Sequence, residues 1–126
     1  NMCIDSHGRI LLQEDIGSAA PLGKICLYDI ATDNLVQVAS HDADRFLTGA
    51  PNFLTIDEES SGIIDARDIL GDGWFLIDDQ AHYGIAGELV EGGQLLAMYV
   101  DPSIVPEPAS IALLSLGLGF LALRRR

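Results

Sequence analysis

The sequence has few basic residues, and this shortage narrows its function. Residues 1–105 contain only four Lys or Arg, against 18 of the chain's 19 acidic residues, all except Glu107. An acidic body repels phosphate backbones, and no patch of Lys or Arg precedes residue 106, so we expect no nucleic-acid partner. Divalent cations are better candidates as partners, although a solvated surface of carboxylates that keeps a protein soluble explains the same charge.

Cysteine is also scarce, with Cys3 and Cys26 as the only two. No Cys-x-x-Cys or Cys/His spacing surrounds them, so we expect no zinc site. Two alternatives remain open for this pair. They form one disulfide, or they are buried free thiols on neighbouring strands, and the count alone does not decide the redox compartment.

Residues 1–101 lack any stretch with a sustained helical period. Short apolar runs alternate instead with turns rich in Gly, Pro, Asn and Asp, and the runs have about the length of average strands. We expect roughly seven short strands without crossover helices, so the predicted fold class is all-β, an antiparallel meander. The expected strands are 2–4, 10–12, 25–28, 35–39, 62–64, 74–77 and 94–100.

The amount of chain in residues 1–101 suits about two blades of an incomplete β-propeller, since a four-stranded blade takes roughly 40 to 50 residues. The sequence begins at Asn1, within an expected strand and without a signal peptide, so we expect further sequence upstream. The predicted organisation is a partial propeller at 1–101, a Pro-rich linker at 102–108, and a transmembrane helix with a basic tail at 109–126.

The C-terminal region has a different composition from the body. The prolines of Pro106-Glu107-Pro108 disfavour helix in the residues before them, which makes this segment a stiff spacer. Residues 109–123 carry no charge, and three arginines follow directly. A helix of this length covers roughly 22 Å, a minimal membrane span. The positive-inside bias keeps the arginines in the cytoplasm and places the body outside it.

These features occur in the order of a known sorting signal. Residues 105–110, the apolar segment and the terminal arginines resemble the PEP-CTERM signal of Gram-negative bacteria. The resemblance implies recognition and cutting by an exosortase, a membrane protease, and a periplasmic, cell-surface or extracellular location. The alternatives are an ordinary membrane anchor and a buried core helix. The residues that carry the signal are Pro106, Glu107, Pro108, Arg124, Arg125 and Arg126.

Asp57-Glu58-Glu59, followed by Asp65 and Asp68, is the densest group of acids. Adjacent carboxylates repel one another unless water or a cation screens them. In a strand, Asp57 and Glu59 would share one face while Glu58 points to the other. Oxygen ligands suit Ca²⁺, but the spacing is not that of an EF-hand and one segment supplies too few ligands. A solvated acidic turn is the alternative.

Residues 1–100 resemble the PhoX-like alkaline phosphatases, which are secreted β-propellers that hydrolyse phosphate esters with bound calcium and iron. Residues 1–15 look like the family's blade signature, residues 59–62 are similar to its Glu-x-Thr-Gly segment, and residues 75–82 are similar to its Gln-His strand. The resemblance implies that Glu59 and Asp15 bind metal and that His82 lies near the site. A hydrogen-bonded structural histidine is the alternative for His82.

Two hypotheses from different classes follow. The first is that the chain is the C-terminal part of an exported, surface-sorted, PhoX-like phosphoesterase, inactive by itself, with calcium and iron as cofactors and a phosphate ester as substrate. The second is a non-enzymatic surface or matrix β-propeller with a PEP-CTERM anchor that binds partners. A small anchored protein, complete as given, is a third possibility. The sequence upstream of Asn1 would discriminate between them. Further blades with acidic residues facing the central channel of the propeller would favour the enzyme, and blades with apolar residues facing that channel would favour a binding scaffold.

Overall fold

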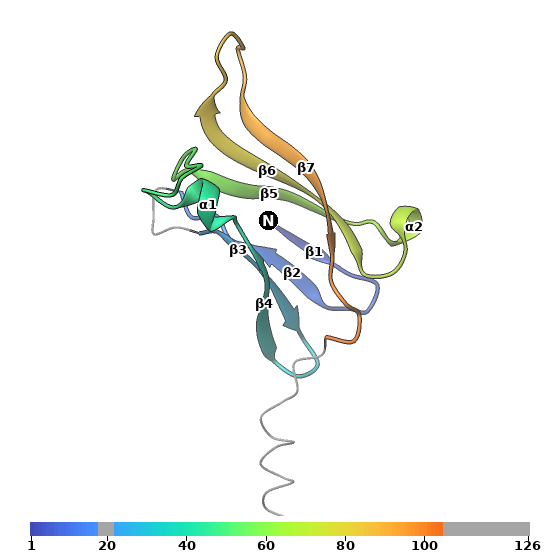
Figure 1. Ribbon diagram of the computed structural model, residues 1–126. Coiled ribbons are helices and arrows are strands. Elements are labelled where there is room, and N and C mark those ends of the chain that lie inside the picture. Colours follow the sequence, from blue (N-terminus) through green and yellow to red (C-terminus); the bar gives the residue numbers. More distant parts are fainter. Residues whose placement is uncertain (18–21, 105–126) are drawn as a thin grey trace, which may run out of the picture.

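Two antiparallel β-sheets form the body of the protein, as seen in the computed structural model, which describes residues 1–17 and 22–104 (Figure 1). In each sheet the strands follow one another in chain order, so every connection joins neighbouring strands. The first sheet contains β1 (Met2–Ile4), β2 (Ile10–Gln13), β3 (Lys24–Asp29) and β4 (Asn34–Ser40). The second contains β5 (Glu58–Asp65), β6 (Trp74–Gly84) and β7 (Glu91–Tyr99), and two short helices, α1 (Ala43–Phe46) and α2 (Arg67–Leu70), lie in connections.

The predicted all-β, antiparallel meander is confirmed, but three strand boundaries were wrong by three residues or more. β5 begins at Glu58 rather than at residue 62, β6 continues to Gly84 rather than ending at residue 77, and β7 begins at Glu91 rather than at residue 94. Acidic residues are depleted in strands, which made the segment 58–61 look like a turn. It joins the ladder because Glu58 and Ser60 are buried between the sheets and register with Ala81 and Asp79 of β6.

The apolar core lies between the two sheets. Leu11 and Leu27 of the first sheet are fully buried, and Phe75 of the second is 1% exposed. These side chains belong to the alternate positions that face inward, which is how a strand covered on one face distributes its apolar residues. The other buried members of this cluster are Ile25, Ile63, Ile77 and Val100.

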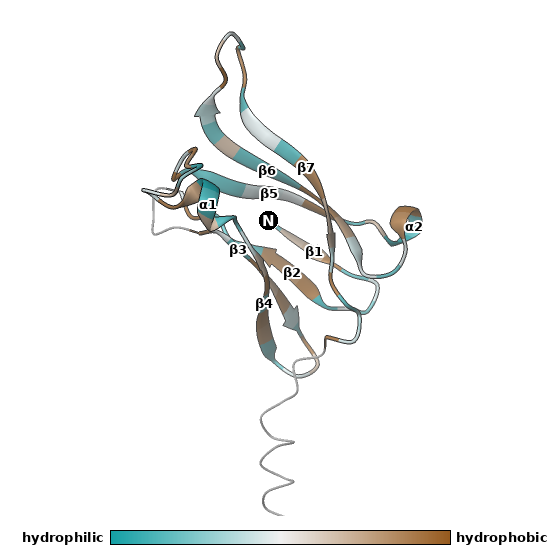
Figure 2. Cartoon of the chain, viewed as in Figure 1, coloured by the Kyte–Doolittle hydropathy of each residue, from teal (hydrophilic) through white to brown (hydrophobic). Residues whose placement is uncertain are grey.

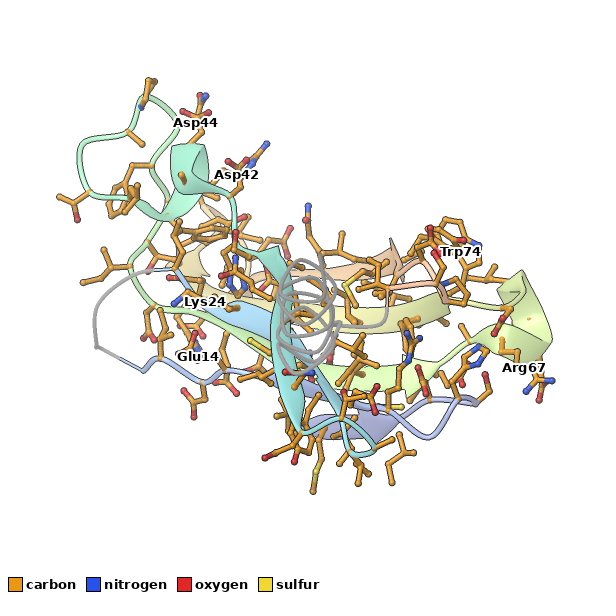
Figure 3. All side chains as sticks on the ribbon, turned by 90° about the horizontal axis from the view of Figure 1, so that it is seen from below. Glu14, Lys24, Asp42, Asp44, Arg67 and Trp74 are labelled. Carbon is orange, nitrogen blue, oxygen red and sulfur yellow. The ribbon has the colours of Figure 1, made fainter. Side chains whose placement is uncertain are left out.

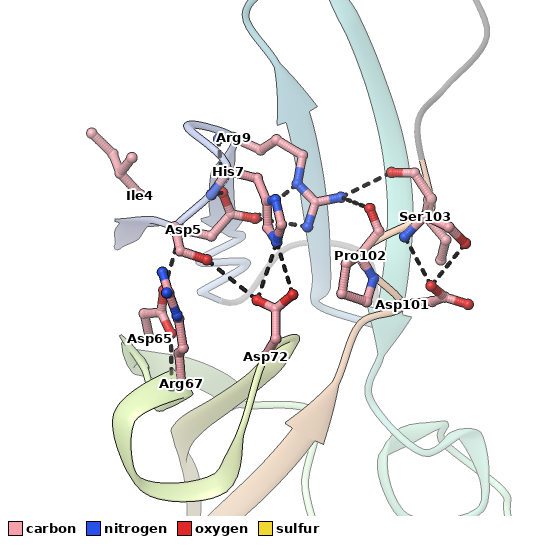
Figure 4. Close-up of polar contacts among 12 residues, drawn as sticks. Ile4, Asp5, His7, Arg9, Asp65, Arg67, Asp72, Asp101, Pro102 and Ser103 are labelled. Carbon is pink, nitrogen blue, oxygen red and sulfur yellow. Dashed lines mark hydrogen bonds and ion pairs between the residues drawn. The ribbon is translucent and has the colours of Figure 1, made fainter.

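The turn between β1 and β2 is built around a buried ion pair (Figure 4). The Asp5 carboxylate accepts hydrogen bonds from the backbone N–H groups of His7 and Arg9, at 2.9 and 2.8 Å. It also binds the Arg9 guanidinium at 2.8 Å from Nε and 2.7 Å from Nη2. Gly8 has φ of +78°, a conformation that side chains with a Cβ disfavour. Arg9 Nη1 then reaches the carbonyls of Pro102 and Ile104, at 3.2 and 3.0 Å.

The predicted C-terminal elements lie outside the described residues. The Pro-Glu-Pro box and the transmembrane helix expected at 109–126 both belong to the part of the chain that the structure does not describe. Within residues 1–17 and 22–104, no helix is long and apolar enough to span a membrane. The finer prediction, about two blades of an incomplete β-propeller, stays a prediction, since the described ranges show one four-stranded and one three-stranded antiparallel sheet.

Candidate functional site

A cavity of about 350 Å³ lies between the two sheets at the end of the body that carries α1. Figure 3 shows this end, marked by Asp42 and Asp44, opposite the end marked by Arg67 and Trp74. One part of the lining is apolar, and polar groups from four strands and the α1 segment converge on the rest. The lining includes Ile25, Phe46, Leu54, Ile77 and Leu96, together with His41, Arg45, Ser60, Asp79, Tyr83 and Gln94.

His41 is the central polar residue of this cavity, and it directly follows the last residue of β4. Its Nε2 lies 2.8 Å from Oδ1 of Asp79, and its Nδ1 lies 2.9 Å from the carbonyl oxygen of Gly23. The ring also packs edge-on against Phe46, with 5.5 Å between ring centroids. Phe46 is the last residue of α1 and is buried, so the short helix holds the imidazole in place.

Both ring nitrogens of His41 face acceptors, which determines its protonation. A backbone carbonyl and a carboxylate only accept, so the imidazolium, with an N–H on each nitrogen, satisfies both contacts. Burial lowers the pKa of His41, but the hydrogen bonds to Asp79 and Gly23 and the charges of Asp79 and Glu58 outweigh it. The net effect is a raised pKa, and the charged form is favoured in the folded protein.

Folding stability should therefore fall as pH rises through the folded-state pKa of His41. A histidine with a raised folded pKa binds its proton more tightly in the folded state, and this contribution is complete only below the unfolded pKa of about 6.5. We expect urea unfolding at pH 6, 7 and 8 to show decreasing stability. The variant His41→Gln should have a shallower pH slope, and an unchanged slope would contradict the assignment. His82→Gln is the comparison variant. The pKa of His82 is also raised, by its hydrogen bond to Glu91, but this histidine is exposed, so screening by solvent should make the change in slope smaller than for His41→Gln.

Glu58 is a second buried carboxylate beside this cavity. Its side chain is fully buried, and Oε1 accepts a hydrogen bond from the Gly23 backbone N–H at 3.2 Å. Oε2 has no hydrogen-bond partner among the described residues. Gln13 Nε2 donates to the Ser60 hydroxyl, and also to the Gly62 carbonyl at 3.1 Å, which links β2 to β5. The cavity thus ends on a polar network that joins the two sheets.

This geometry favours binding over acid–base catalysis. His41 could accept a proton from a substrate only after it loses a proton and one of its two hydrogen bonds, since both nitrogens are engaged. The apolar wall and the convergent polar groups are instead typical of a site for a small organic ligand. Arg45 supplies a positive charge to the lining of the cavity, and its Nε lies 3.7 Å from Oδ2 of Asp42.

The residues predicted from the sequence to bind metal lie elsewhere. Glu59 is on β5 with its side chain directed away from the core, and it registers with Gln80 of β6. His82, further along β6, is exposed, and its Nδ1 lies 2.7 Å from Oε2 of Glu91. This hydrogen bond, together with the charges of Glu91, Asp57 and Glu59, raises the pKa of His82 despite the opposing effect of desolvation.

Asp15 is separated from this pair in the fold. It lies in the loop after β2, is exposed, and accepts a hydrogen bond from the Gly17 backbone N–H at 3.0 Å. The structure therefore brings Glu59 near His82, and no contact joins Asp15 to either in the described ranges. Across residues 1–17 and 22–104, no group of three or more His, Cys, Asp or Glu side chains is arranged to hold a metal ion.

Sequence reasoning missed the residues that the cavity brings together. His41 and Asp79 are 38 positions apart, and Gly23 and Glu58 are 35 apart, so no local spacing connects them. Alternation alone would also have misplaced Glu58. A strict period of two puts Glu58 on the same face as Ile64, which is exposed, but the register shifts between Ser60 and Gly62, and Glu58 lies on the buried face.

Comparison with known proteins identifies the C-terminal region. Residues 105–126 match the family of the PEP-CTERM protein-sorting motif. No curated protein and no solved structure matches the chain, so the resemblance of the body to PhoX-like phosphatases has no support from a relative. Signals of this type are processed by exosortases and imply export and sorting at the cell envelope of Gram-negative bacteria. The chain therefore carries a PEP-CTERM protein-sorting motif at its C-terminus, over residues 105–126.

Proposed function

We propose that this protein is an exported binding protein whose C-terminal signal passes it to an exosortase-type protease for delivery to the cell surface. The sorting motif at residues 105–126 is the observation that carries this proposal. The acidic composition of the remainder agrees with it, because a high net charge keeps an exported domain soluble and monodisperse. The cavity beside His41 is the site that we propose for a small ligand.

Replacing Pro106-Glu107-Pro108 with three alanines in the exporting host tests the sorting role. We expect the uncut chain to accumulate in the membrane fraction and the surface-exposed form to be lost, because the protease would no longer recognise its substrate. Immunoblots of cell fractions and antibody labelling of intact cells measure both effects. Replacing the exposed residues Pro51 and Glu88 with alanine is the matched control. Unchanged cutting and delivery of the triple variant would refute the proposal.

A phosphoesterase with calcium and iron is the finer hypothesis, and it rests on the resemblance of the body to PhoX-like propellers. One observation agrees with the predicted position: Glu59 registers with Gln80 of β6, so it lies on the same outward face as His82, two positions further along that strand. Calorimetric calcium binding that disappears in the variant Glu59→Gln would support it. The phosphate-ester substrate, and a parent protein with more blades, belong to the same hypothesis.

A further inference from the structure

The outward face of the first sheet is apolar along its paired rows, and the nearest carboxylates, Glu14 and Asp33, lie in the connections at its rim. We define the outer apolar face as the outward side chains of β1 to β4. Met2, Ile4 and Leu35 on this face are 68%, 64% and 60% exposed. Figure 2 colours every residue by its hydropathy, so the brown along β2 and β4 comes from the inward core residues and from the outward apolar residues together. The members of the face are Met2, Ile4, Ile10, Leu12, Cys26, Tyr28 and Leu35, bordered by Lys24, Gln37 and Ser40.

The strand register shows that these residues form continuous rows. Residues paired across an antiparallel ladder share a face, so Met2, Leu12 and Cys26 form one row across three strands. Ile4, Ile10, Tyr28 and Leu35 form a second row across all four strands. An antiparallel sheet with a solvated outer face normally alternates apolar and polar positions. Contiguous exposed apolar patches of this kind mark interaction sites.

We propose that the outer apolar face is the interface of a homodimer, in which the first sheets of two copies pack face to face. Charge favours this arrangement. Each copy has a formal charge of −12, so two copies repel each other over most of their surface. The paired rows of the outer apolar face contain no acid. Asp33, which accepts a hydrogen bond from the Tyr28 hydroxyl at 2.7 Å, and Glu14 lie at the rim, so the centre of the contact brings no carboxylates together.

The outer face of the second sheet is less suited to self-association. It also exposes apolar residues, including Leu95 at 75% and Tyr99 at 53%. However, Asp78 stands on this face in the central strand β6, paired with Gly62 and Leu95 on either side. Two copies that met through this face would bring two Asp78 carboxylates into a desolvated interface, which is costly for like charges.

The size of the face indicates a weak dimer. Four strands at a spacing of about 4.8 Å, each covering roughly 17 Å, give a footprint of roughly 300 Å² per copy. Two such faces cover roughly 600 Å² in total, which is below the roughly 1,200–2,000 Å² of stable specific complexes, so the contact alone gives only weak association. A dimer of this size forms mainly where the local concentration is high. The sorting signal would provide that concentration, because it collects many copies on one surface. The contact between the two sheets does not itself depend on sorting.

Cys26 provides a probe for this interface. It lies on the inner strand β3, near the middle of the outer apolar face, and its thiol is free. Facing sheets are about 10 Å apart, beyond the Cα separation of about 7 Å that a disulfide tolerates. A short bismaleimide should therefore join two copies of Cys26 where direct oxidation would not. Cys3 packs against the core, and the variant Cys3→Ala leaves Cys26 as the only thiol.

The experiment uses the full chain with Cys3→Ala, reconstituted in phosphatidylcholine vesicles, so a failure of sorting cannot affect the result. We expect the bismaleimide to give a covalent dimer on denaturing gels. Adding Leu35→Glu should reduce the dimer at least about tenfold, because it would bury a carboxylate against apolar surface. Leu95→Glu, on the opposite face, is the matched control and should leave the dimer unchanged.

Three results would overturn the proposal: no dimer in the parent chain, an equal yield with Leu35→Glu, or a loss with Leu95→Glu alone. Trp74 fluorescence checks that each variant is folded. Should Leu35→Glu disturb the fold, Met2→Glu at the edge strand β1 makes the same test, since Met2 is 68% exposed.

Discussion

Replacing Arg9 with methionine is expected to lower the free energy of unfolding by about 3–5 kcal/mol, because it leaves a buried carboxylate without its cation. Arg9 and Asp5 are 4% and 7% exposed, and their ion pair measures 2.7 Å. The same substitution removes two hydrogen bonds to the carbonyls of Pro102 and Ile104. Urea unfolding followed by the fluorescence of Trp74, the only tryptophan, measures the loss.

Arg45→Met is the matched control for this prediction. The Arg45 side chain is 56% exposed and lies 3.7 Å from Asp42, so its ion pair is screened by solvent. Loss of this ion pair should lower the free energy of unfolding by less than about 1 kcal/mol. A loss for Arg9→Met no larger than that for Arg45→Met would show that the buried pair contributes little net stability.

Arg9→Lys separates charge from geometry at the same position. Lysine keeps the positive charge, but its single ammonium group cannot bind the Asp5 carboxylate and both carbonyls at once, as the planar guanidinium does. We therefore expect an intermediate stability. The segment 101–104 should also become more sensitive to limited proteolysis, because Arg9 holds the chain directly before residue 105, where the sorting motif begins.

The architecture was more predictable from the sequence than the cavity. Strands and turns depend largely on local interactions. A short window of sequence is enough to show the alternating apolar runs and the Gly- or Asp-rich turns between them, such as the turn at residues 5–8. The main errors in the strands were at residues 58–61 and 78–84, where a polar and acidic composition looked like turns. The β-bulge between Ser60 and Gly62 also shifts the alternation of β5, so a strict period of two would not have identified its buried face. Burial of Glu58 is made possible by the backbone N–H of Gly23, a contact between the two sheets.

The cavity could not be predicted because its residues meet only through sheet packing. His41 follows the end of β4, and nothing in the neighbouring sequence distinguishes it from a solvated turn residue. Its partner Asp79 occurs within an acidic pair on β6, where alternation turns Asp79 toward the cavity and Asp78 outward. The sequence also drew attention to Glu59 through its resemblance to a metal ligand, whereas the buried carboxylate of that segment is its neighbour Glu58.

Replacing Leu27 with alanine is expected to destabilise the body by about 2–5 kcal/mol, since it removes a fully buried side chain and leaves a cavity. Leu27 sits on the central strand β3 and belongs to the cluster that contains Phe75 of the other sheet. Its loss should therefore weaken the packing of one sheet on the other, and with it the cavity that both sheets line.

Leu89→Ala makes the same chemical change at the tip of the β6–β7 hairpin, which extends beyond the rest of the body (Figure 1). Leu89 is fully exposed, so this control should change stability by less than about 0.5 kcal/mol. Urea unfolding of both variants, followed by Trp74 fluorescence, gives the comparison. Similar losses in the two variants would mean that the body does not depend on a core between its sheets. A large loss only for Leu27→Ala would show that stability depends on the core shared by the two sheets, which also holds together the cavity between them.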